Sequence, residues 1–600
     1  MGPMEGIRQL LGSFMDALDP IVARVNGWVW EKGIPVAGEE IPFVVIALLG
    51  TGFYLTLYLG FVQIRRFRHG VAVTSGKYDD PNEPGDVSHF QALTTALSAT
   101  VGIGNIAGVA LAIHWGGPGA LFWMWMTAFF GMAIKYTEVT LAQRYREVSE
   151  DLDPNTFEGS VAGGPMYYIE RGLGPRWKWM AVFFAVMLGF TAFLTGNAVQ
   201  ANTVADSMAG KFGTPTWLTG LVTTLIVFSV IIGGIKRIGK VTAVLAPAMA
   251  AIYVLGGLYV ILTNIDQVLP SFALIFREAF NPTAGVAGTG VGAFLVTLMW
   301  GVKRGLFSNE SGQGSAPIAH AAAKTDEPVS EGVVALLEPF IDTIVICTIT
   351  ALTIIITGAW KERVPTALDL RSGDVSYIAL QENGRYVRVS PPAEIRIVDG
   401  AHASEEVGAP LFAWHEAKVE RFYVDPEMTV LFNGVIDVAR GVARADDGTE
   451  YPTLHGEAVE SGAPLTMLAF RHGLPGEWGD YIVLISVILF AVSTAISWSY
   501  YGDRCAYYLF GPKAVLPYKL VYVAMHFVGA TLALNTIWAI GDIALGIVIL
   551  PNLIALILLA PQVKEMTNSY FERKPWIENA EVHARIVAER KAAKQAQQIS

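Results

Sequence analysis

One stretch of the chain places glycines and an amide side chain where an uninterrupted apolar helix would be expected. In SATVGIGNIAGVA, residues 98–110, Gly102, Gly104 and Asn105 interrupt an apolar run. Inside hydrocarbon every backbone N–H and C=O must be paired, so unwound backbone survives only where it is buried in protein or lines a cavity. We therefore expect these residues to break a membrane helix and to free backbone groups for a ligand.

The same stretch is close to the G-x-G-x-x-G pattern of a dinucleotide-binding turn. That pattern requires a strand before it, a helix after it and an acidic residue about 20 positions later. Here an apolar run precedes the glycines, and the first charged side chain downstream is Lys135. The broken membrane helix is the better interpretation.

A second stretch, GLFSNESGQGSAP at residues 305–317, repeats this combination. Asn309, Glu310 and Gln313 lie among glycines and before Pro317. The plainer interpretation of either stretch is close helix packing through glycine. Helix N-termini favour anions, whereas C-terminal carbonyls favour cations. Two breaks side by side would therefore suit Na⁺ and a zwitterion.

The composition indicates a polytopic membrane protein. Of the 600 residues, 52% are hydrophobic and 16% are charged, and the mean hydropathy is +0.43. We predict an all-α fold with about eleven transmembrane helices, because apolar runs long enough to cross the hydrocarbon recur along the chain. The predicted spans are 42–64, 89–113, 119–145, 178–208, 216–234, 241–263, 286–324 (interrupted), 331–358, 480–509, 516–535 and 538–561.

Basic residues set the expected orientation in the membrane. Lys and Arg follow the first, third, fifth and ninth predicted spans and recur in the tail at 563–600. Because positive loops stay in the cytoplasm, we predict a multi-pass protein of the inner or plasma membrane, with its N-terminus outside and its C-terminus cytoplasmic. Residues 1–40 resemble an amphipathic region lying on membrane lipid, since apolar residues recur there at helical spacing.

Residues 361–479 differ from the spans around them. Short β-like runs such as YIAL, YVRVS, EIRIV and RFYVD alternate with Gly, Pro, Asp and Asn, and this range carries most of the formal charge of −11. We predict a small β-rich extracytoplasmic insert that shields the outer mouth. A dedicated ligand or partner site is the alternative.

The sequence gives no indication of catalysis. The two cysteines lie in or beside apolar spans, the ten histidines lack metal-ligand spacing, and no Walker-type phosphate loop occurs. We expect no enzymatic activity, no organic cofactor and no nucleic-acid partner. The oligomeric state stays open.

The two breaks predict an internal repeat. With 41–70 set aside as an accessory helix, they fall in the first helix of two five-helix groups, one at 88–263 and one at 285–360 with 480–562. An odd number of spans per group makes the repeats inverted. Transporters of this kind bind substrate and coupling ion at broken helices near the midplane.

Six ordered motifs carry a resemblance to a known family. They are ALSATVGIGNIAGVALAIHWGGPGALFWMW, GGPMYYIERGLG, GNAVQAN, WGVKRGLFSNESGQGSAPIAHAAAKTDEP, LEPFIDTIVICT and STAISWSYYGDR. Over 40–360 and 460–565 the chain resembles the alanine or glycine:cation symporter family. The resemblance implies Na⁺-coupled uptake of alanine or glycine by alternating access, in a LeuT-type fold of five plus five helices and one accessory helix. Usual members have a short loop in place of the insert, so its effect on access and regulation stays open.

The resemblance also implies a sodium site between the second and ninth predicted spans. By position, the ligands are the carbonyls of Ser98, Val101 and Phe490 and the hydroxyls of Ser493 and Thr494. The alternative for the two hydroxyls is a hydrogen bond back to their own helix.

A substrate site is implied at the two breaks. The unwound residues 100–105 and 311–314 would hold the carboxylate and ammonium groups of a small neutral amino acid. A pocket walled by Phe193 and Trp498 would admit a methyl or hydrogen side chain and little more. The predicted substrate residues are Thr100, Gly102, Gly104, Asn105, Phe193, Gln200, Ser311, Gly312, Gln313, Gly314 and Trp498.

Two acidic residues in the spans have basic neighbours in the sequence. Glu138 lies near Lys135, which indicates a structural ion pair. Glu310 lies in the second break, about two turns after Lys303 and Arg304, where a gate salt bridge and a ligand role are both open.

Glu338 and Asp342 fall near the position of another sodium site in the leucine transporter. A second sodium site made by Asn105, Ser308 and Glu338 is one possibility. Two alternatives to sodium symport stay open. One is an H⁺-coupled transporter or exchanger that uses Glu310 or Asp342, and the other is a membrane sensor that reads a ligand through the insert.

Overall fold

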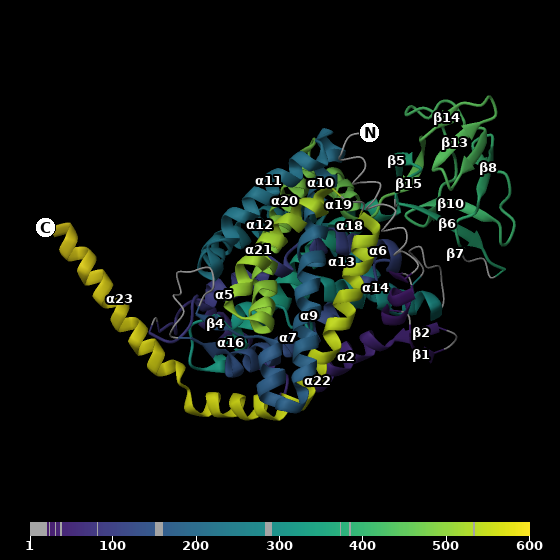
Figure 1. The fold of residues 1–600 in the computed structure, drawn as a ribbon. Helices are drawn as coiled ribbons and strands as arrows, with labels where there is room; N and C mark the ends of the chain where they lie inside the picture. Colours follow the sequence, from purple (N-terminus) through teal and green to yellow (C-terminus); the bar gives the residue numbers. More distant parts are fainter. Residues whose placement is uncertain are drawn as a thin grey trace.

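The computed structural model describes residues 21–599, except 23, 31, 37–38, 81, 150–159, 283–290, 373, 383–385 and 532–533. Half of the predicted N-terminal region therefore lies outside the described residues. Its other end forms an antiparallel hairpin, β1 (Gly33–Val36) with β2 (Glu39–Pro42), which helical periodicity does not predict. Figure 1 shows a body of packed helices, a strand-rich lobe at one end and a C-terminal helix that projects from the opposite end.

Helices lie over the ranges of the predicted spans, and further helices at 67–74, 265–280, 462–473 and 576–599 lie outside those ranges. In the first half of the chain they are α2 (Phe43–Tyr58), α4 (Phe67–Thr74), α5 (His89–Thr100), α6 (Ala107–Gly116), α7 (Ala120–Tyr145), α9 (Lys178–Phe193), α10 (Val199–Phe212), α11 (Thr216–Ile231) and α12 (Gly234–Thr263). In the second half they are α13 (Ile265–Phe280), α14 (Val291–Asn309), α15 (Ala316–His320), α16 (Pro328–Ala335), α17 (Leu337–Pro339), α18 (Thr348–Thr357), α19 (Gly462–Gly473), α20 (Trp478–Phe510), α21 (Val515–Thr531), α22 (Leu534–Arg573) and α23 (Trp576–Ile599).

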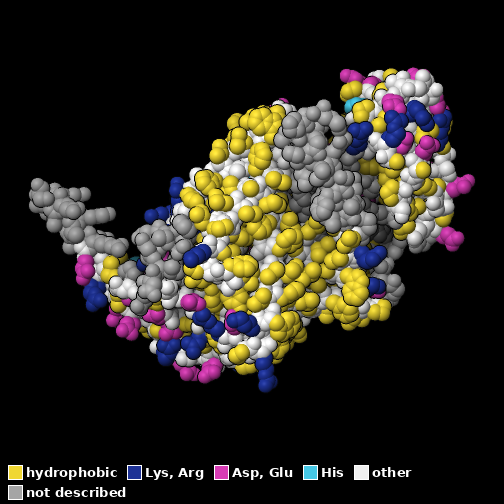
Figure 2. All heavy atoms as spheres, viewed as in Figure 1, with side chains coloured by type: hydrophobic (Ala, Val, Ile, Leu, Met, Phe, Trp, Pro, Cys, Tyr) yellow, Lys and Arg dark blue, Asp and Glu magenta, His cyan; other side chains and the backbone are white. Residues whose placement is uncertain are grey.

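The described helices have the length and composition of a multi-pass membrane protein. Six are long and apolar enough to cross a membrane, and the bent pair His89–Thr100 with Ile103–Gly116 makes a seventh candidate. Figure 2 shows apolar side chains covering the helical body, whereas charged side chains gather on the strand-rich lobe and near the C-terminal helix. An apolar surface of this extent marks contact with lipid.

The first predicted break is present in the structure. A capping box of Ser88 and Gln91 starts α5. The helix ends at Thr100 because Gly102 is extended, with φ −131° and ψ −157°. A single 3₁₀ turn at Ile103–Asn105 then leads into α6, and the two halves are bent by 60°.

The second predicted break separates α14 from α15. Glu310, Gly312 and Gly314 all have positive φ, at 55°, 88° and 77°. This left-handed backbone is cheap for glycine and uncommon for glutamate. The run of three ends the helical hydrogen-bond ladder after Asn309, and α15 begins with Pro317 in its first turn.

The two breaks meet inside the body. Asn105 of the first break donates to the hydroxyl of Ser308 at the end of α14, with 3.0 Å between Nδ2 and Oγ. A Cβ built on Gly104 would lie 2.9 Å from the Phe307 ring, so the backbones approach closely. Helices α12 and α20 pack on α5, and α14 packs on α6 and α7.

The strand-rich lobe lies between α18 and α19. Its strands are β5 (Arg363–Asp369), β6 (Val375–Leu380), β7 (Tyr386–Arg388), β8 (Glu394–Val398), β9 (Ala401–His402), β10 (Pro410–Trp414), β11 (Ala417–Lys418), β12 (Gly434–Asp437), β13 (Val442–Ala445), β14 (Glu450–Tyr451) and β15 (Thr453–Val459). They form antiparallel sheets with orders β11-β10-β6-β7 and β14-β13-β12-β8-β9, and β5 pairs with β15. The run RFYVD at 421–425 is no strand; only Tyr423 makes isolated bridges.

The boundary of this lobe differs from the prediction of 361–479. After β15, α19 returns to the helical body, where Thr466 donates to the carbonyl of Ile106 at the first break, at 3.1 Å. The lobe also touches the body through His114 of α6, whose Nε2 donates to the His415 carbonyl at 2.8 Å.

Candidate functional site

Four of the five predicted sodium ligands converge where α20 passes the first break. The hydroxyls of Ser493 and Thr494 lie 3.3 and 3.2 Å from the Ser98 carbonyl oxygen. The Ser493 hydroxyl is also 2.9 Å from the carbonyl of Phe490. All four residues are buried. Both hydroxyls therefore reach across to α5, and that of Ser493 also bonds to α20 itself.

The fifth predicted ligand, Val101, ends α5 beside this group. It is buried, and its N–H bonds the Leu97 carbonyl at 2.7 Å. The next residue, Gly102, is held against α20, because a Cβ built on it would lie only 2.7 Å from the Thr494 hydroxyl. A larger residue at Gly102 would press on that ligand.

Side-chain oxygens with unused hydrogen-bonding capacity surround the breaks. Ser98 Oγ, Gln200 Oε1, Ser311 Oγ and Gln313 Oε1 are buried and have no hydrogen-bond partner among the described residues. Buried polar atoms are normally paired, so such a group needs an explanation. Gln200 also lies 3.8 Å from the Cβ position of Gly102. This is the donor set that a polar ligand or cation would complete.

The side chain of Asn105 forms hydrogen bonds within the first break and with Asp342. Its Oδ1 accepts from the N–H of Gly102 at 2.9 Å, while its Nδ2 donates to Asp342 Oδ1 at 2.6 Å. Ser308 and Thr343 donate to the other oxygen of Asp342, at 2.6 and 2.7 Å. Among the described residues, no basic nitrogen lies within 4 Å of this carboxylate. The predicted grouping of Asn105 and Ser308 with Glu338 is wrong, because Asp342 takes that place.

Two residues that the sequence did not place at the second break hold it. Glu138 Oε1 accepts from the N–H of Gly314 at 3.1 Å. Asn552 of α22 donates to the Gly312 carbonyl at 2.8 Å and to Glu138 at 2.5 Å. Glu138 is therefore a cap on the break and not the partner of Lys135, as its sequence neighbours had suggested.

Trp498 and Glu310 are joined, one turn beyond the sodium ligands on α20. The Trp498 indole N–H donates to Glu310 Oε1 at 2.9 Å, and Ser315 donates to Oε2 at 2.5 Å. The Trp498 ring packs on Gly196, where a Cβ would lie 2.3 Å from it. Glu310 is thus hydrogen-bonded within the break, and of the two open alternatives the salt bridge to Lys303 or Arg304 is not among the ion pairs of the described residues.

Two other predicted substrate residues, Thr100 and Phe193, contact neighbouring protein groups. Thr100 bonds back to Ala96 and Leu97 of its own helix, at 3.2 and 3.4 Å. The ring of Phe193 packs against Tyr518 and Tyr522 of α21, with centroids 4.7 and 5.9 Å away. Phe193 thus lines the interface of α9 with α21 and not the space between the breaks.

The basic residues of α14 have a partner that the sequence analysis missed. Lys303 and Arg304 reach Asp542 of α22, at 2.7 and 3.3 Å. Asp542 is the only acidic residue in the apolar run 534–561, and that isolation was the available signal. Lys135 instead pairs with Glu338 at 2.8 Å.

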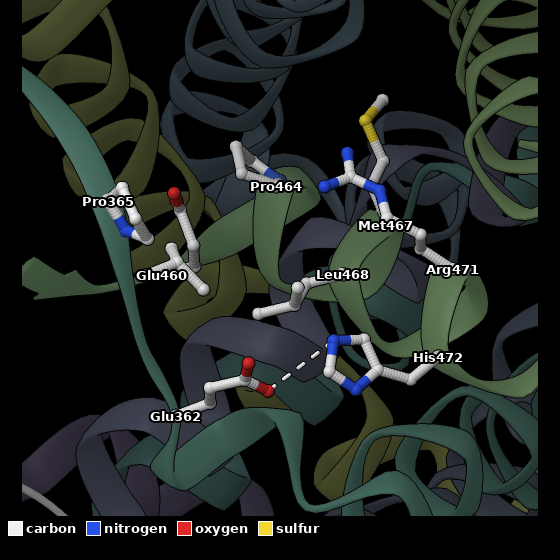
Figure 3. Close-up of a pocket in the computed structure, with 9 residues that line it drawn as sticks. Glu362, Pro365, Glu460, Pro464, Met467, Leu468, Arg471 and His472 are labelled. Carbon is white, nitrogen blue, oxygen red and sulfur yellow. Dashed lines mark ion pairs between the residues drawn. The ribbon is translucent and has the colours of Figure 1, made fainter. Parts of the chain in front are cut away.

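A cavity of about 380 Å³ lies away from the breaks, between the start of β5 and α19 (Figure 3). His472 and Glu362 face each other across it at 3.4 Å. Arg471 and Glu460 also line it. No group of three or more His, Cys, Asp or Glu side chains in the described part of the chain is placed to hold a metal ion. The breaks remain the candidate site.

Comparison with known proteins agrees with this geometry. The sequence model of the sodium:alanine symporter family matches residues 15–381 and 449–584. The chain belongs to this family. The unmatched segment between these ranges falls inside the strand-rich lobe, where the chain departs from the family pattern. As a family member, the protein is a cation-coupled amino-acid symporter of a multi-pass membrane type and not an enzyme.

Curated relatives carry related descriptions. A sodium/alanine symporter of Methanococcus maripaludis is 39% identical over 93% of this chain and 99% of its own length. In Bacillus subtilis, a putative sodium/proton-dependent alanine carrier is 32% identical over 92% of this chain and 92% of its own length. A probable sodium/glutamine symporter of the same organism is 30% identical over 93% of this chain and 91% of its own length.

Proposed function

We propose that this symporter couples Na⁺ to the uptake of a small neutral amino acid, alanine or glycine, by alternating access. The observation that carries the proposal is the meeting of Ser98, Phe490, Ser493 and Thr494 oxygens beside the unwound Gly102. Hard oxygen donors in a buried, uncharged setting suit a small cation. In this proposal Val101 contributes its carbonyl as the fifth ligand.

The substrate would lie between the two breaks. The positive N-terminal ends of broken helices favour a carboxylate, and the negative C-terminal ends favour an ammonium group. Gln200, Ser311 and Gln313 offer buried oxygens that are still unpaired in the described structure. The Trp498 indole, held by Glu310, supplies a rigid wall on one side. This arrangement supports a substrate with a short side chain.

A second cation position is supported at Asp342. An ionised carboxylate in a buried site is costly without a compensating charge. Its contacts are the neutral donors Asn105, Ser308 and Thr343. A Na⁺ bound here would balance the charge and would draw on the same Asn105 that closes the first break. Bound substrate and this ion would then be coupled through one side chain.

Coupling follows from differential affinity. A ligand shifts a conformational equilibrium only by binding one state better than the other. The sodium ligands come from two elements, α5 and α20, so the ion holds them together and favours the state in which they touch. We further propose a LeuT-type inverted repeat, with the lobe of 363–459 outside the cell and the C-terminal tail in the cytoplasm.

Uptake by proteoliposomes tests this function. Labelled alanine should accumulate under an inward Na⁺ gradient and should leak out when the gradient is collapsed. Unlabelled alanine, glycine and glutamine as competitors identify the substrate, since one relative is described as a probable glutamine symporter. Accumulation that ignores the Na⁺ gradient would refute the sodium coupling.

Proton coupling is the second candidate, because one relative is described as sodium/proton-dependent. A pH gradient imposed without Na⁺ separates the two. If it alone drives accumulation, the coupling ion is H⁺. Removal of 363–459 tests the sensor alternative, since a symporter should keep substrate binding without the lobe.

A further inference from the structure

A network of titratable side chains runs through the body at the end where the C-terminal tail lies, and its inner end comes close to Glu138 and Glu310 at the second break. His89 and His320 both bond the carboxylate of Glu331, the latter at 2.5 Å. His320 Nε2 lies 3.6 Å from Glu338, which pairs with Lys135 at 2.8 Å. Each of these five side chains is at most 2% exposed.

The network of titratable side chains reaches the protein surface at Asp79, in the loop before α5. Its Oδ1 lies 4.0 Å from His89 Nε2, and its side chain is 30% exposed. The tail covers this loop, since His583 bonds the Asp79 carbonyl at 3.1 Å and Asn579 bonds Glu83 at 3.2 Å. Burial raises the pKa of Asp79, so its carboxyl takes up a proton more readily than an exposed aspartate. Asp79 therefore gives the network an entrance for protons on the side of the C-terminal tail.

The buried part of this network holds more carboxyl groups than basic groups. Two carboxylates, Glu331 and Glu338, face a single ammonium, Lys135. Because buried charges are costly unless balanced, one imidazolium on His89 or His320 would offset part of this excess. Arg146 is the other cation that faces Glu331. The further carboxyl groups that face the network are Asp79, Glu83, Glu138, Glu310 and Asp342, so acidic groups still outnumber basic ones.

The two histidines lie on the parts of the molecule that carry the breaks. His89 is the first residue of α5, and His320 is the last residue of α15. Glu331 of α16 holds both at once. Gln143 of α7 also donates to the His320 carbonyl, at 2.5 Å. The network thus ties the tail-side halves of both broken helices to helices α7 and α16.

We propose that the His89–Glu331–His320–Glu338 cluster binds one proton taken from the tail side and that this proton locks the tail-side pathway shut. The proton bridges imidazole and carboxylate across the interface of α5, α15 and α16. Its loss leaves an unbalanced negative charge, which weakens the tie and lets the halves separate. The inference rests on the transport cycle of the family and does not depend on which ion drives uptake.

Cysteine alkylation reports on this lock without substrate or sodium. Ala323 is fully buried beside the loop at 84–87, so a thiol from Ala323→Cys becomes reactive only when the tail side opens. The native Cys347 and Cys505 are buried, and labelling of the parent chain gives their background. The alkylation rate is measured in proteoliposomes while the pH on the tail side is varied and the other side is held constant.

The alkylation rate of Ala323→Cys is also measured in a variant that carries His320→Gln. Because the thiol ionises in both proteins, the ratio of the two rates corrects for that ionisation. We expect the ratio of the two rates, network intact over His320→Gln, to rise with tail-side pH by up to about tenfold per unit, the limit for one proton. Glu331→Gln provides a second variant if His320→Gln fails to fold. His472→Gln, at the cavity by α19, is the matched control and should keep the full dependence. A ratio that does not change with tail-side pH in either variant overturns the proposal, as does a dependence on the opposite compartment.

Discussion

The contact of Gly102 with Thr494 allows a sharp test of the sodium site through a residue that carries no ligand side chain. Gly102 has φ −131°, which any residue adopts, so Gly102→Ala strains the backbone little. Its new methyl would lie 2.7 Å from the Thr494 hydroxyl and 3.8 Å from Gln200 Oε1. Only the first distance is far below van der Waals contact. The hydroxyl must therefore move by several tenths of an ångström, while Gln200 stays in place.

The size of the effect follows from losing one contact to a charge. A hydrogen-bond-like contact to an ionised group contributes about 1.5–3 kcal/mol. At about 1.4 kcal/mol per tenfold, Gly102→Ala should raise the Na⁺ concentration for half-maximal uptake roughly 10- to 150-fold. At saturating Na⁺ the alanine half-saturation should change little, because Gln200 is not displaced.

Uptake rates at varied Na⁺ measure this directly, with expression and unfolding temperature as folding checks. Gly50→Ala on α2 is the matched control, since a Cβ there meets nothing within 4 Å. An unchanged Na⁺ half-saturation in a well-folded Gly102→Ala protein would remove Thr494 from the ligand set.

Two further predictions concern stability. Gly196→Ala places a methyl 2.3 Å from the Trp498 ring, and this overpacking should destabilise the folded protein by about 1–3 kcal/mol in thermal unfolding. Gly189→Ala is the control, since its methyl would lie at an ordinary 3.4 Å from the nearest neighbour and should not destabilise the protein. Equal unfolding midpoints of the two variants would contradict the packing. Burial lowers the pKa of His415, but the hydrogen bond and charge of Asp374 outweigh it and raise the pKa above 6.5. Stability from this pair is complete below pH 6.5 and is lost as pH rises through the raised pKa of His415. The thermal midpoint of the lobe should therefore fall as pH rises above 6.5, and the midpoint of His415→Asn should not. Asparagine suits the left-handed φ of 51° at this position, and an equal slope in the variant would refute the prediction.

The breaks could be predicted because their signal is local. Gly102 and Asn105 in one apolar run, and Glu310 with Gly312 and Gly314 in another, are chain positions where helical hydrogen bonding fails. Membrane helices rarely tolerate such residues without a reason, so the inference needs no tertiary information. The sodium ligands came instead from a family resemblance, and the structure brings four of the five together.

The ionic partners could not be predicted because they are tertiary. Lys135 and Glu138 are three residues apart on one helix and could pair, yet the fold offers Lys135 a closer partner in Glu338 and offers Glu138 the N–H of Gly314. Asn552 joins the second break from the far end of the sequence. Which of several buried partners is chosen depends on helix packing, and no local pattern encodes it.

Local sequence patterns also did not predict two short elements, α19 after the lobe and the hairpin near the N-terminus. Residues 462–473 are too short to be read as a membrane span, yet they form α19 and reach the first break through Thr466. The hairpin at 33–42 is too short for a period-two pattern to be distinguished from a loop. Segments of this length take their structure from the surface on which they pack.

The central claim is that Na⁺ at the site of Ser98, Ser493 and Thr494 and an amino acid bind together at the two breaks, and binding by the purified protein tests it most directly. By thermodynamic linkage, Na⁺ must lower the Kd of alanine by the same factor by which alanine lowers the Kd of Na⁺. We predict a shared factor of roughly 5 to 150 that falls strongly when Ser493→Ala and Thr494→Ala are combined. An alanine Kd that is the same in Na⁺ and in K⁺, in a protein that still binds alanine, would contradict the account.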